Sequence, residues 1–416
     1  MSFKSYRSTI GACCLGYMST AIANNLAPIF FMIFQTDFAI GDEKLSVLIF
    51  MNFAIQFFMD LISAKFVDRI GYRPAAIAAS SFVCVGLCLM GFLPTVIPDT
   101  FVALLVSVSV YAVGAGILEV IVSPIVEYSS EKRSSSMMNV LHSFYCWGQM
   151  LVILCSTLML WVFGSDFWNV IPFIWAILPF VNIFWFAVSP IKNAPVAKEE
   201  QKTFRSMFSS LTFIMILLMM TCAGAAELSM SQWSSLFAEK ALGVEKVVGD
   251  IAGPCLFALT MGSGRLLYSF FGDRFDLSRT LVLASVGCTI CYFTAALSPI
   301  PYLSLAACAL TGFFVSVMWT GMINISAEKY PNGGTGMFGL LALFGDIGCA
   351  VGPCLSGFVS DLSEDFELLP QGEGLRAGIG ASAIFPLLLT ALLFVFLKRT
   401  SRISRTSRNS RTSLTS

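Results

Sequence analysis

The chain has 416 residues, of which 56% are hydrophobic and only 12% are charged. Soluble domains are about 25% charged, so this composition excludes a soluble globular protein and predicts an integral membrane protein. The formal net charge is zero, which gives no reason to expect a nucleic-acid partner. The 13 cysteines and the single histidine lack zinc-ligand spacing, so we expect reduced thiols and neither a metal nor a cofactor.

Apolar runs long enough to cross a bilayer follow one another along the chain. About 20 apolar residues span the hydrocarbon core as a helix. Runs of this kind centre on residues 9–34, 45–66, 74–93, 101–125, 138–162, 168–188, 207–237, 247–271, 280–297, 302–325, 337–359 and 379–397. The sequence therefore predicts an all-α integral membrane fold of twelve transmembrane helices in two six-helix bundles. We expect bundles over 1–191 and 207–398, a cytoplasmic linker over 192–206 and a disordered basic tail over 399–416.

Basic and acidic residues alternate between successive connecting segments. Arg69 and Arg73 follow the second run and Arg274 follows the eighth, whereas Asp361 and Glu364 end the eleventh. Cytoplasmic loops carry an excess of lysine and arginine. We therefore expect a multi-pass protein of the cell membrane with both termini in the cytoplasm, in contact with lipid and monomeric.

A charged loop occurs twice in the chain. AKFVDRIGYR follows the second run, and SFFGDRFDLSR follows the eighth. Their Asp-Arg pairs, Asp68-Arg69 and Asp273-Arg274, are 205 residues apart. Eight residues before each aspartate, inside the apolar runs, stand Asp60 and Arg265. This duplication predicts two related halves, and many transporters built in this way bind their solute near the mid-plane between the halves.

The repeated loop resembles the G-x-L-A-D-R-x-G-R-R motif of the major facilitator superfamily. The first copy departs from the motif at Ala64 and Tyr72, and in the second copy Asp276 stands in place of the later glycine. In that family the loop is a conformational latch, so the resemblance implies a gating role and a pair of six-helix bundles. With the two charged residues upstream, the predicted gating set is Asp60, Asp68, Arg69, Gly71, Arg73, Arg265, Asp273, Arg274 and Arg279.

One carboxylate lies inside the fourth apolar run, in the stretch VGAGILEVIVSP. A charge at this depth costs about 2.5–3.5 kcal/mol on insertion scales, so an intramembrane acid points to a functional site. Gly114 and Gly116 precede Glu119 and thin the helix, and Pro124 loosens its hydrogen bonding. We expect Glu119 to face a water-filled cavity, and the structural alternative is a tie between two helices.

The same stretch resembles the fourth helix of the fucose–proton symporter branch, which includes sodium-linked glucose carriers. In that branch the matching glutamate binds sugar hydroxyls and helps to couple protons, which the resemblance implies for Glu119. The first helix of the branch ends in Asn-Asp and its aspartate carries the proton, whereas this chain has Asn24-Asn25. An amide cannot titrate, so sugar contact carries over to Asn25 and proton coupling does not.

Other intramembrane polar and aromatic residues complete the predicted site. GAAELSMSQW in the seventh run is similar to the seventh helix of the branch, and amides and an indole suit sugar recognition. The predicted substrate-binding residues are Asn24, Asn25, Glu119, His142, Gln149, Glu227, Gln232, Trp233, Trp319 and Asn324. Because histidine and buried acids can titrate near neutral pH, the candidate proton carriers are Glu119, His142 and Asp346.

The sequence favours a carrier of a small polar solute, above all a monosaccharide, that works by alternating access with or without a coupled proton or sodium ion. A drug- or metabolite-exporting antiporter of the same fold is the main alternative. The G-x-x-x-G-P stretch typical of exporters is missing from the fifth run, and GCAVGP stands in the eleventh. A receptor or membrane enzyme is the third reading, but no nucleotide loop, HExxH or nucleophile elbow occurs. The sequence therefore predicts no catalytic residues.

Overall fold

Nearly the whole chain is α-helical, because a helix satisfies every backbone N–H and C=O within one segment when no water is present. The computed structural model describes residues 3–129, 134–191, 208–271, 274–330, 334–366 and 373–412. The first half comprises α1 (Phe3–Ile29), α2 (Phe31–Phe38), α3 (Asp42–Ile70), α4 (Tyr72–Val96), α5 (Thr100–Ser129), α6 (Ser134–Phe163), the 3-10 helix η1 (Ser165–Asn169) and α7 (Ile171–Val188). The second half comprises α9 (Leu211–Lys240), α10 (Lys246–Asp250), the π-helix η2 (Ile251–Cys255), α11 (Leu256–Phe271), α12 (Leu277–Leu297), α13 (Pro301–Val315), α14 (Met318–Lys329), α15 (Gly334–Asp365), α16 (Gly374–Ser382) and α17 (Ile384–Thr412).

The helices match the predicted membrane spans in number. Within the described residues, eleven helices are long and apolar enough to cross a membrane, and α1 with α2 makes a twelfth candidate. The two parts of this twelfth candidate are bent by 40° after Ile29. Pro28 lies in the last turn of α1, where its ring and missing N–H favour a break. The single first span predicted from the sequence is therefore a broken one.

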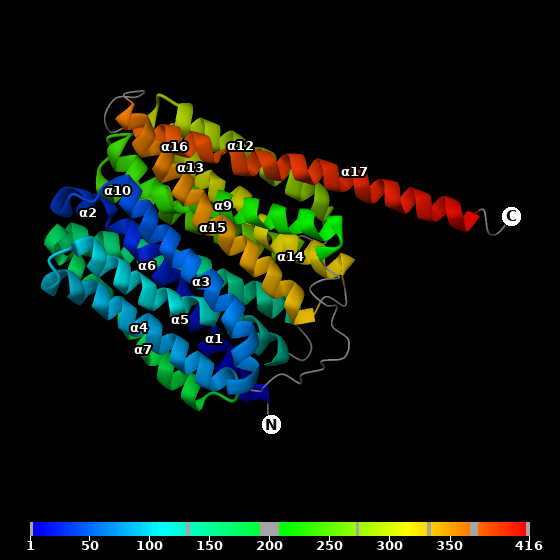
Figure 1. The fold of residues 1–416 in the computed structure, drawn as a ribbon, viewed down its shortest axis with the longest axis horizontal. Helices are drawn as coiled ribbons and strands as arrows, with labels where there is room; N and C mark the ends of the chain where they lie inside the picture. The colour runs from blue at the N-terminus through cyan, green and yellow to red at the C-terminus, as the bar shows by residue number, and fades with distance from the viewer. Residues whose placement is uncertain are drawn as a thin grey trace.

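The two halves lie side by side, with the first in blue to green and the second in green to red (Figure 1). Within the first half α4 packs on α5 and α7, and α1 packs on α6, while in the second half α9 packs on α15 and α12 on α13. Between the halves, α3 packs along α15, α6 along α11 and α1 against α9. The boundaries of the two bundles stay a prediction.

Both chain termini lie at one end of the molecule, here called the termini end (Figure 1). The opposite, far end carries the turns that follow α2, α4, α9, α12 and α15. α17 continues to Thr412, so its helix extends into the segment for which the sequence predicts disorder. Arginine is a good helix former and serine a moderate one, which is compatible with a helical extension there.

The glycines before Glu119 have a different role from the predicted one. A Cβ on Gly114 would lie 2.3 Å from the carbonyl oxygen of Ala79, and one on Gly116 would lie 2.9 Å from Cα of Gln56. Both glycines therefore let α5 approach its neighbours α4 and α3 closely, as small residues do between membrane helices. They therefore serve helix packing and do not thin α5 on the side of a cavity, as the sequence had predicted.

Candidate substrate and coupling site

Four carboxyl groups and one guanidinium occupy the middle of the helices. Glu119 of α5 lies within electrostatic range of Glu227 of α9, Asp60 of α3 and Asp346 of α15. Arg265 of α11 is ion-paired with Glu227. Residues from five helices and both halves thus meet in one cluster. Intramembrane ionisable groups of this kind are expensive to bury and usually serve a function.

Arg265 connects the two halves. Its Nη2 lies 3.4 Å from Glu227 Oε2 in the second half. Its Nη1 donates across to the first half, to the carbonyl oxygen of His142 at 3.4 Å and to Sγ of Cys146 at 3.3 Å. The prediction gave Arg265 a gating role. Its contacts place it at the junction of α6 and α11, and Glu227 supplies the acidic partner that such a buried cation needs.

Glu119 is the carboxyl group of the cluster with the most access. It is half-buried, whereas Asp60, Asp346 and Glu227 are 4%, 2% and 7% exposed. Among the described residues no hydrogen bond or ion pair engages the Glu119 side chain. A carboxylate in the middle of the bundle that is accessible and has no protein partner is able to accept hydrogen bonds from a solute.

Asn24 is held by residues of its own half. Its Nδ2 donates to the Tyr145 hydroxyl at 3.3 Å, and its Oδ1 accepts from Asn52 and from Gln56, both at 3.0 Å. The amide oxygens Asn52 Oδ1 and Gln56 Oε1 are buried and have no partner. The predicted ligand Asn24 is therefore already bonded within the protein, and its two neighbours on α3 present free acceptors instead.

Gln232 and Gln149 tie the halves together near the middle. Gln232 Nε2 donates to the backbone carbonyl of Asn24 at 3.1 Å and to Oδ1 of Asn25 at 3.3 Å. Gln149 Nε2 donates to the Ser231 hydroxyl at 2.6 Å. Both glutamines are 2% exposed. In this conformation these two glutamines, with Asn24 and Asn25, form contacts between α1, α6 and α9.

His142 belongs to an aromatic group that the sequence reading missed. Its Nδ1 lies 3.1 Å from the Tyr17 hydroxyl, and the two rings meet edge to face with centroids 5.2 Å apart. Tyr145 packs edge-on against Tyr17 at 5.7 Å. Tyr17 precedes Asn24 by two helical turns, so it shares a helix face with that residue. This spacing is the signal that could have identified it.

The remaining predicted ligands are dispersed. Trp233 is fully buried, and its Nε1 donates to the carbonyl oxygen of Pro353 at 2.9 Å, so its indole joins α9 to α15. Trp319 is half-buried and packs against Gly345. Asn324 is exposed. The structure therefore groups Glu119, His142 and Glu227 in the middle of the bundle and engages Trp233 in packing.

Polar contacts close the far end between α3, α9 and α15. The carboxylate of Asp42 pairs with Lys240 at 3.2 Å and accepts from the Ser360 hydroxyl at 3.0 Å. One residue further on, the backbone N–H of Glu43 donates to Asp361 at 2.6 Å. These bonds join the N-terminus of α3 to the second half. The helix dipole favours acids such as Asp42 at the N-terminus of a helix.

A second group of contacts closes the same end around α10. Lys246 Nζ donates to the carbonyl oxygen of Ile29 at 2.9 Å and pairs with Glu239 at 2.9 Å. The Thr157 hydroxyl of α6 donates to Asp250 at 2.6 Å. Asp250 is fully buried, so these bonds hold a desolvated charge between the halves.

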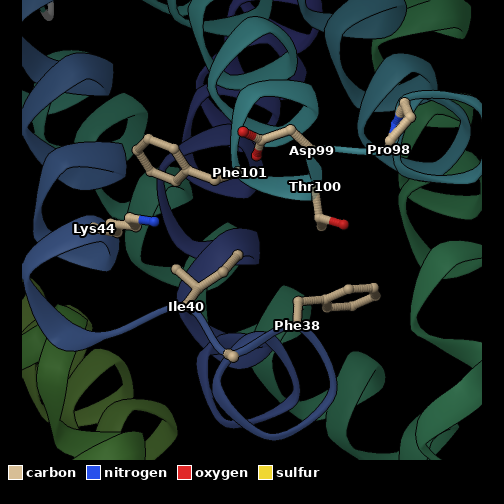
Figure 2. A pocket seen from close by; sticks show the side chains of 8 residues that line it. Phe38, Ile40, Lys44, Pro98, Asp99, Thr100 and Phe101 are labelled. Atoms are coloured by element: carbon tan, nitrogen blue, oxygen red, sulfur yellow. The ribbon is translucent and has the colours of Figure 1, made fainter.

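A surface pocket at the far end is separate from the central cluster. It has a volume of about 520 Å³ and is lined by Phe38, Ala39, Ile40, Lys44, Pro98, Asp99, Thr100 and Phe101 (Figure 2). All of these residues lie in the first half, at the ends of α2, α3, α4 and α5. The Lys44 ammonium lies 5.6 Å from the centre of the Phe101 ring. None of the central carboxyl groups contributes to its lining.

Comparison with known proteins identifies the fold and the family. The family model described as Major Facilitator Superfamily matches residues 12–254 and 254–415. The chain belongs to the major facilitator superfamily. No match was found among curated proteins.

Solved structures of other superfamily transporters share this fold. A variant of the E. coli fucose:proton symporter FucP is 17% identical, with a TM-score of 0.66 over 95% of this chain and 98% of that one. A bacterial homolog of the human lysosomal transporter Spinster, inward-facing and occupied, is 16% identical, with a TM-score of 0.73 over 94% and 97%. A variant of the nucleoside transporter NupG is 11% identical, with a TM-score of 0.72 over 94% and 99%. These likenesses show the fold, and membership of the superfamily makes the chain a multi-pass secondary transporter of an all-helical, non-enzymatic family.

The superfamily loop is visible in part. Gly71 links α3 to α4 with φ 92°, a backbone angle that favours glycine. Arg73 donates to the carbonyl oxygen of Ser189 at 2.7 Å, within its own half. The side chains of Asp68 and Arg69, in the last turn of α3, are outside the described residues. Their latch role stays a prediction.

In the second copy of the loop, Asp273 is outside the described residues. Arg274 and Arg279 are exposed. Asp276, which departs from the motif, is the N-cap of α12, where its carboxylate accepts from the backbone N–H of Arg279 at 2.8 Å. An aspartate at this position stabilises the first turn of the helix, which explains why the second copy keeps an acid where the motif has glycine.

Proposed function

We propose that the protein carries a monosaccharide or a similar polyhydroxy solute across the cell membrane by alternating access, coupled to protons. The observation that carries this proposal is the position of Glu119, which is half-buried, has no bonded partner among the described residues and is surrounded by residues of both halves. Solutes of this class present hydroxyl donors. The free acceptors Asn52 Oδ1 and Gln56 Oε1 are complementary to such donors.

The far-end contacts support an inward-facing or occluded state. With both termini in the cytoplasm, as the basic loops indicate, the bonds of Asp42, Lys240 and Lys246 close the outer side. Substrate then exchanges between Glu119 and the cytoplasm, and rocking of the halves must break these bonds to open the outer side. Two structural neighbours are a fucose:proton symporter and a nucleoside transporter, and both of these solute classes are rich in hydroxyl groups.

The solute class is tested by thermal stabilisation of the purified full chain. Hexoses, pentoses, polyols, nucleosides and, as the exporter alternative, organic cations are compared at equal concentration. A ligand at about 100 times its Kd adds about 2.7 kcal/mol of stability, so at least one polyhydroxy compound should raise Tm. Stabilisation by organic cations alone would favour the efflux antiporter instead.

The role of Glu119 is tested by Glu119→Gln in proteoliposomes. We expect uptake of the stabilising solute to be lost or to become independent of a pH gradient, while membrane insertion and Tm are retained. Asp99→Asn is the matched control, because it removes an exposed far-end acid that only caps the Val102 N–H. Accumulation by Glu119→Gln that stays unchanged between about pH 5 and pH 8 contradicts the proposal.

The loop after α3 is tested by Asp68→Asn. A latch acts on the rate of exchange between states, so this change should slow turnover more than it weakens solute affinity. The two are separated by measuring initial uptake rates together with equilibrium binding in detergent. An equal loss in both measurements would count against the latch.

A further inference from the structure

Asp60 and Asp346 face each other where α3 packs along α15. The two side chains lie within electrostatic range of each other across the junction of the two halves. They are 4% and 2% exposed. Among the described residues, neither oxygen of Asp60 has a donor, and Oδ2 of Asp346 has none either. Two buried acids without a donor therefore lie on neighbouring helices of the two halves.

Two ionised carboxylates are unfavourable in this arrangement. Both offer only acceptors, and like charges that are close together in a dry site repel strongly. A single proton allows an O–H···O⁻ hydrogen bond between them, which is among the stronger ones in proteins. Paired aspartates that share one proton in this way are known from other buried acid pairs.

Among the described residues, the groups that surround the two aspartates supply no free positive charge. Glu119 of α5 faces both aspartates, and Tyr17 of α1 and Cys349 of α15 are within electrostatic range of Asp346. The guanidinium of the cluster, Arg265, is already paired with Glu227. The neighbours of Asp60 and Asp346 thus add negative charge or none, which favours a bound proton.

The duplication of the sequence relates the Asp60–Asp346 pair at the α3–α15 junction to a second pair, Arg265 and His142, at the α6–α11 junction. Asp60 and Arg265 occupy matching positions of the two halves, and His142 and Asp346 lie 204 residues apart in matching helices. At the α6–α11 junction, Arg265 donates to the His142 carbonyl at 3.4 Å. At the α3–α15 junction, two acids meet instead. One junction is therefore held by a fixed cation and the other requires a titratable proton.

We propose that Asp60 and Asp346 hold one proton between them, and that this shared proton fastens α3 to α15 in the conformation described here. Loss of the proton to water leaves two carboxylates whose repulsion separates the helices, which links the position of the halves to proton movement. The inference rests on the proposed proton coupling and assigns the proton to this pair, while Glu119, which faces both aspartates, links the bound solute to it. The contact weakens as pH rises, because deprotonation removes its only donor.

The proton is tested without any solute, by difference infrared spectroscopy of the purified full chain in lipid nanodiscs. A protonated buried carboxyl gives a carbonyl stretch that an ionised one lacks. We expect the wild type to show this band at neutral pH and to lose it as pH rises. In Asp60→Asn and Asp346→Asn the amide supplies the donor, so both variants should fold and the band should fall by about one carboxyl per chain.

Asp99→Asn is the control, because it removes an exposed acid outside the cluster and should leave the band unchanged. Glu119→Gln removes a negative charge that faces both aspartates, so it should lower the pH at which the band is lost without removing the band. A band unchanged in both aspartate variants, or lost in Glu119→Gln alone, overturns the proposal. The spectra are repeated with sodium replaced by N-methylglucamine, and a band that grows when sodium is removed would show a sodium site instead. Failure of sugar uptake alone would leave all of these spectra as expected.

Discussion

Lys240 of α9 and Asp42 of α3 form an ion pair of 3.2 Å that crosses from one half to the other at the far end. Asp42 is 1% exposed and also accepts from Ser360 of α15 and from Gln35 of α2. A single carboxylate thus connects four helices, and among the described residues the further acidic partner of Lys240 is Glu364, at 3.8 Å. Opening the far end requires that this carboxylate lose both of its partners in the second half.

Asp42→Asn should therefore shift the protein toward the state that is open at the far end. Coupling energies of this kind are about 1–3 kcal/mol, which corresponds to about 5–150-fold in the equilibrium. The measurement is the labelling rate of Ser46→Cys, a position 2% exposed beneath the contacts, by a membrane-impermeant maleimide. Asp99→Asn, an acid of the same end outside this group, should leave the rate unchanged. Equal labelling in both variants would show that Asp42 does not hold the far end closed.

Glu227→Gln should destabilise the whole fold. The side chains of Arg265 and Glu227 are each 9% exposed, so the change leaves a buried guanidinium without its counter-charge. Breaking a buried pair in this way costs about 3–5 kcal/mol, which thermal unfolding in detergent would show as a lower Tm. The control is Glu119→Gln, which neutralises a carboxyl that has no ion-pair partner and should leave Tm nearly unchanged.

A double variant separates the ion pair from other effects of the substitution. Glu227→Gln combined with Arg265→Gln removes both charges, so its Tm should lie above that of Glu227→Gln alone. The difference between the double variant and the sum of the single ones is the coupling energy. A coupling near zero would mean that Arg265 is held by its His142 and Cys146 contacts instead.

The fold followed from the sequence because its cause is local. Apolar runs of membrane-spanning length predict helices one at a time, and the duplicated Asp68 and Asp273 loops indicate how the helices pair into halves. The break after Ile29 could not be placed from Pro28 alone, since prolines also lie inside α4 and α7 without a comparable break between spans. Whether a proline bends a membrane helix depends on which neighbours satisfy the freed carbonyl group.

The sequence predicted the charged residues of the site but not the hydrogen bonds that its polar residues form. Glu119 stood out because an acid is rare in an apolar run, whereas nothing in the sequence tells that Asn24 bonds to Gln56 and Tyr145. Such bonds depend on how helices rotate about their axes, which packing of both halves decides. For the same reason the sequence does not reveal that Asp60 and Asp346, 286 residues apart in the chain, lie within electrostatic range of each other.

Trp233→Phe should lower the stability of the protein, whereas Trp319→Phe should lower its affinity for the solute. Trp233 is fully buried and bonds to the Pro353 carbonyl, so its loss removes a hydrogen bond and some packing, about 1–3 kcal/mol of stability. Trp319 is half-buried, so its replacement should lower solute affinity with little change in Tm. Both are measured as Tm with and without the stabilising solute. Loss of affinity without loss of stability in Trp233→Phe would return this residue to the solute site.

Gly348→Ala should show how closely α15 approaches α9. A Cβ at this position would lie 2.0 Å from the carbonyl oxygen of Thr221, in the backbone of the neighbouring helix, which cannot yield as a side chain could. Overpacking of this kind costs about 1–3 kcal/mol, so Tm in detergent should fall.

Gly339→Ala is the matched control on the same helix, where a Cβ meets no atom within 4 Å. Because alanine favours a helix over glycine by about 1 kcal/mol, this control should keep or raise Tm. Equal Tm values in the two variants would mean that α9 and α15 separate easily, and the close packing of these helices would then not contribute to the rigidity of the second half.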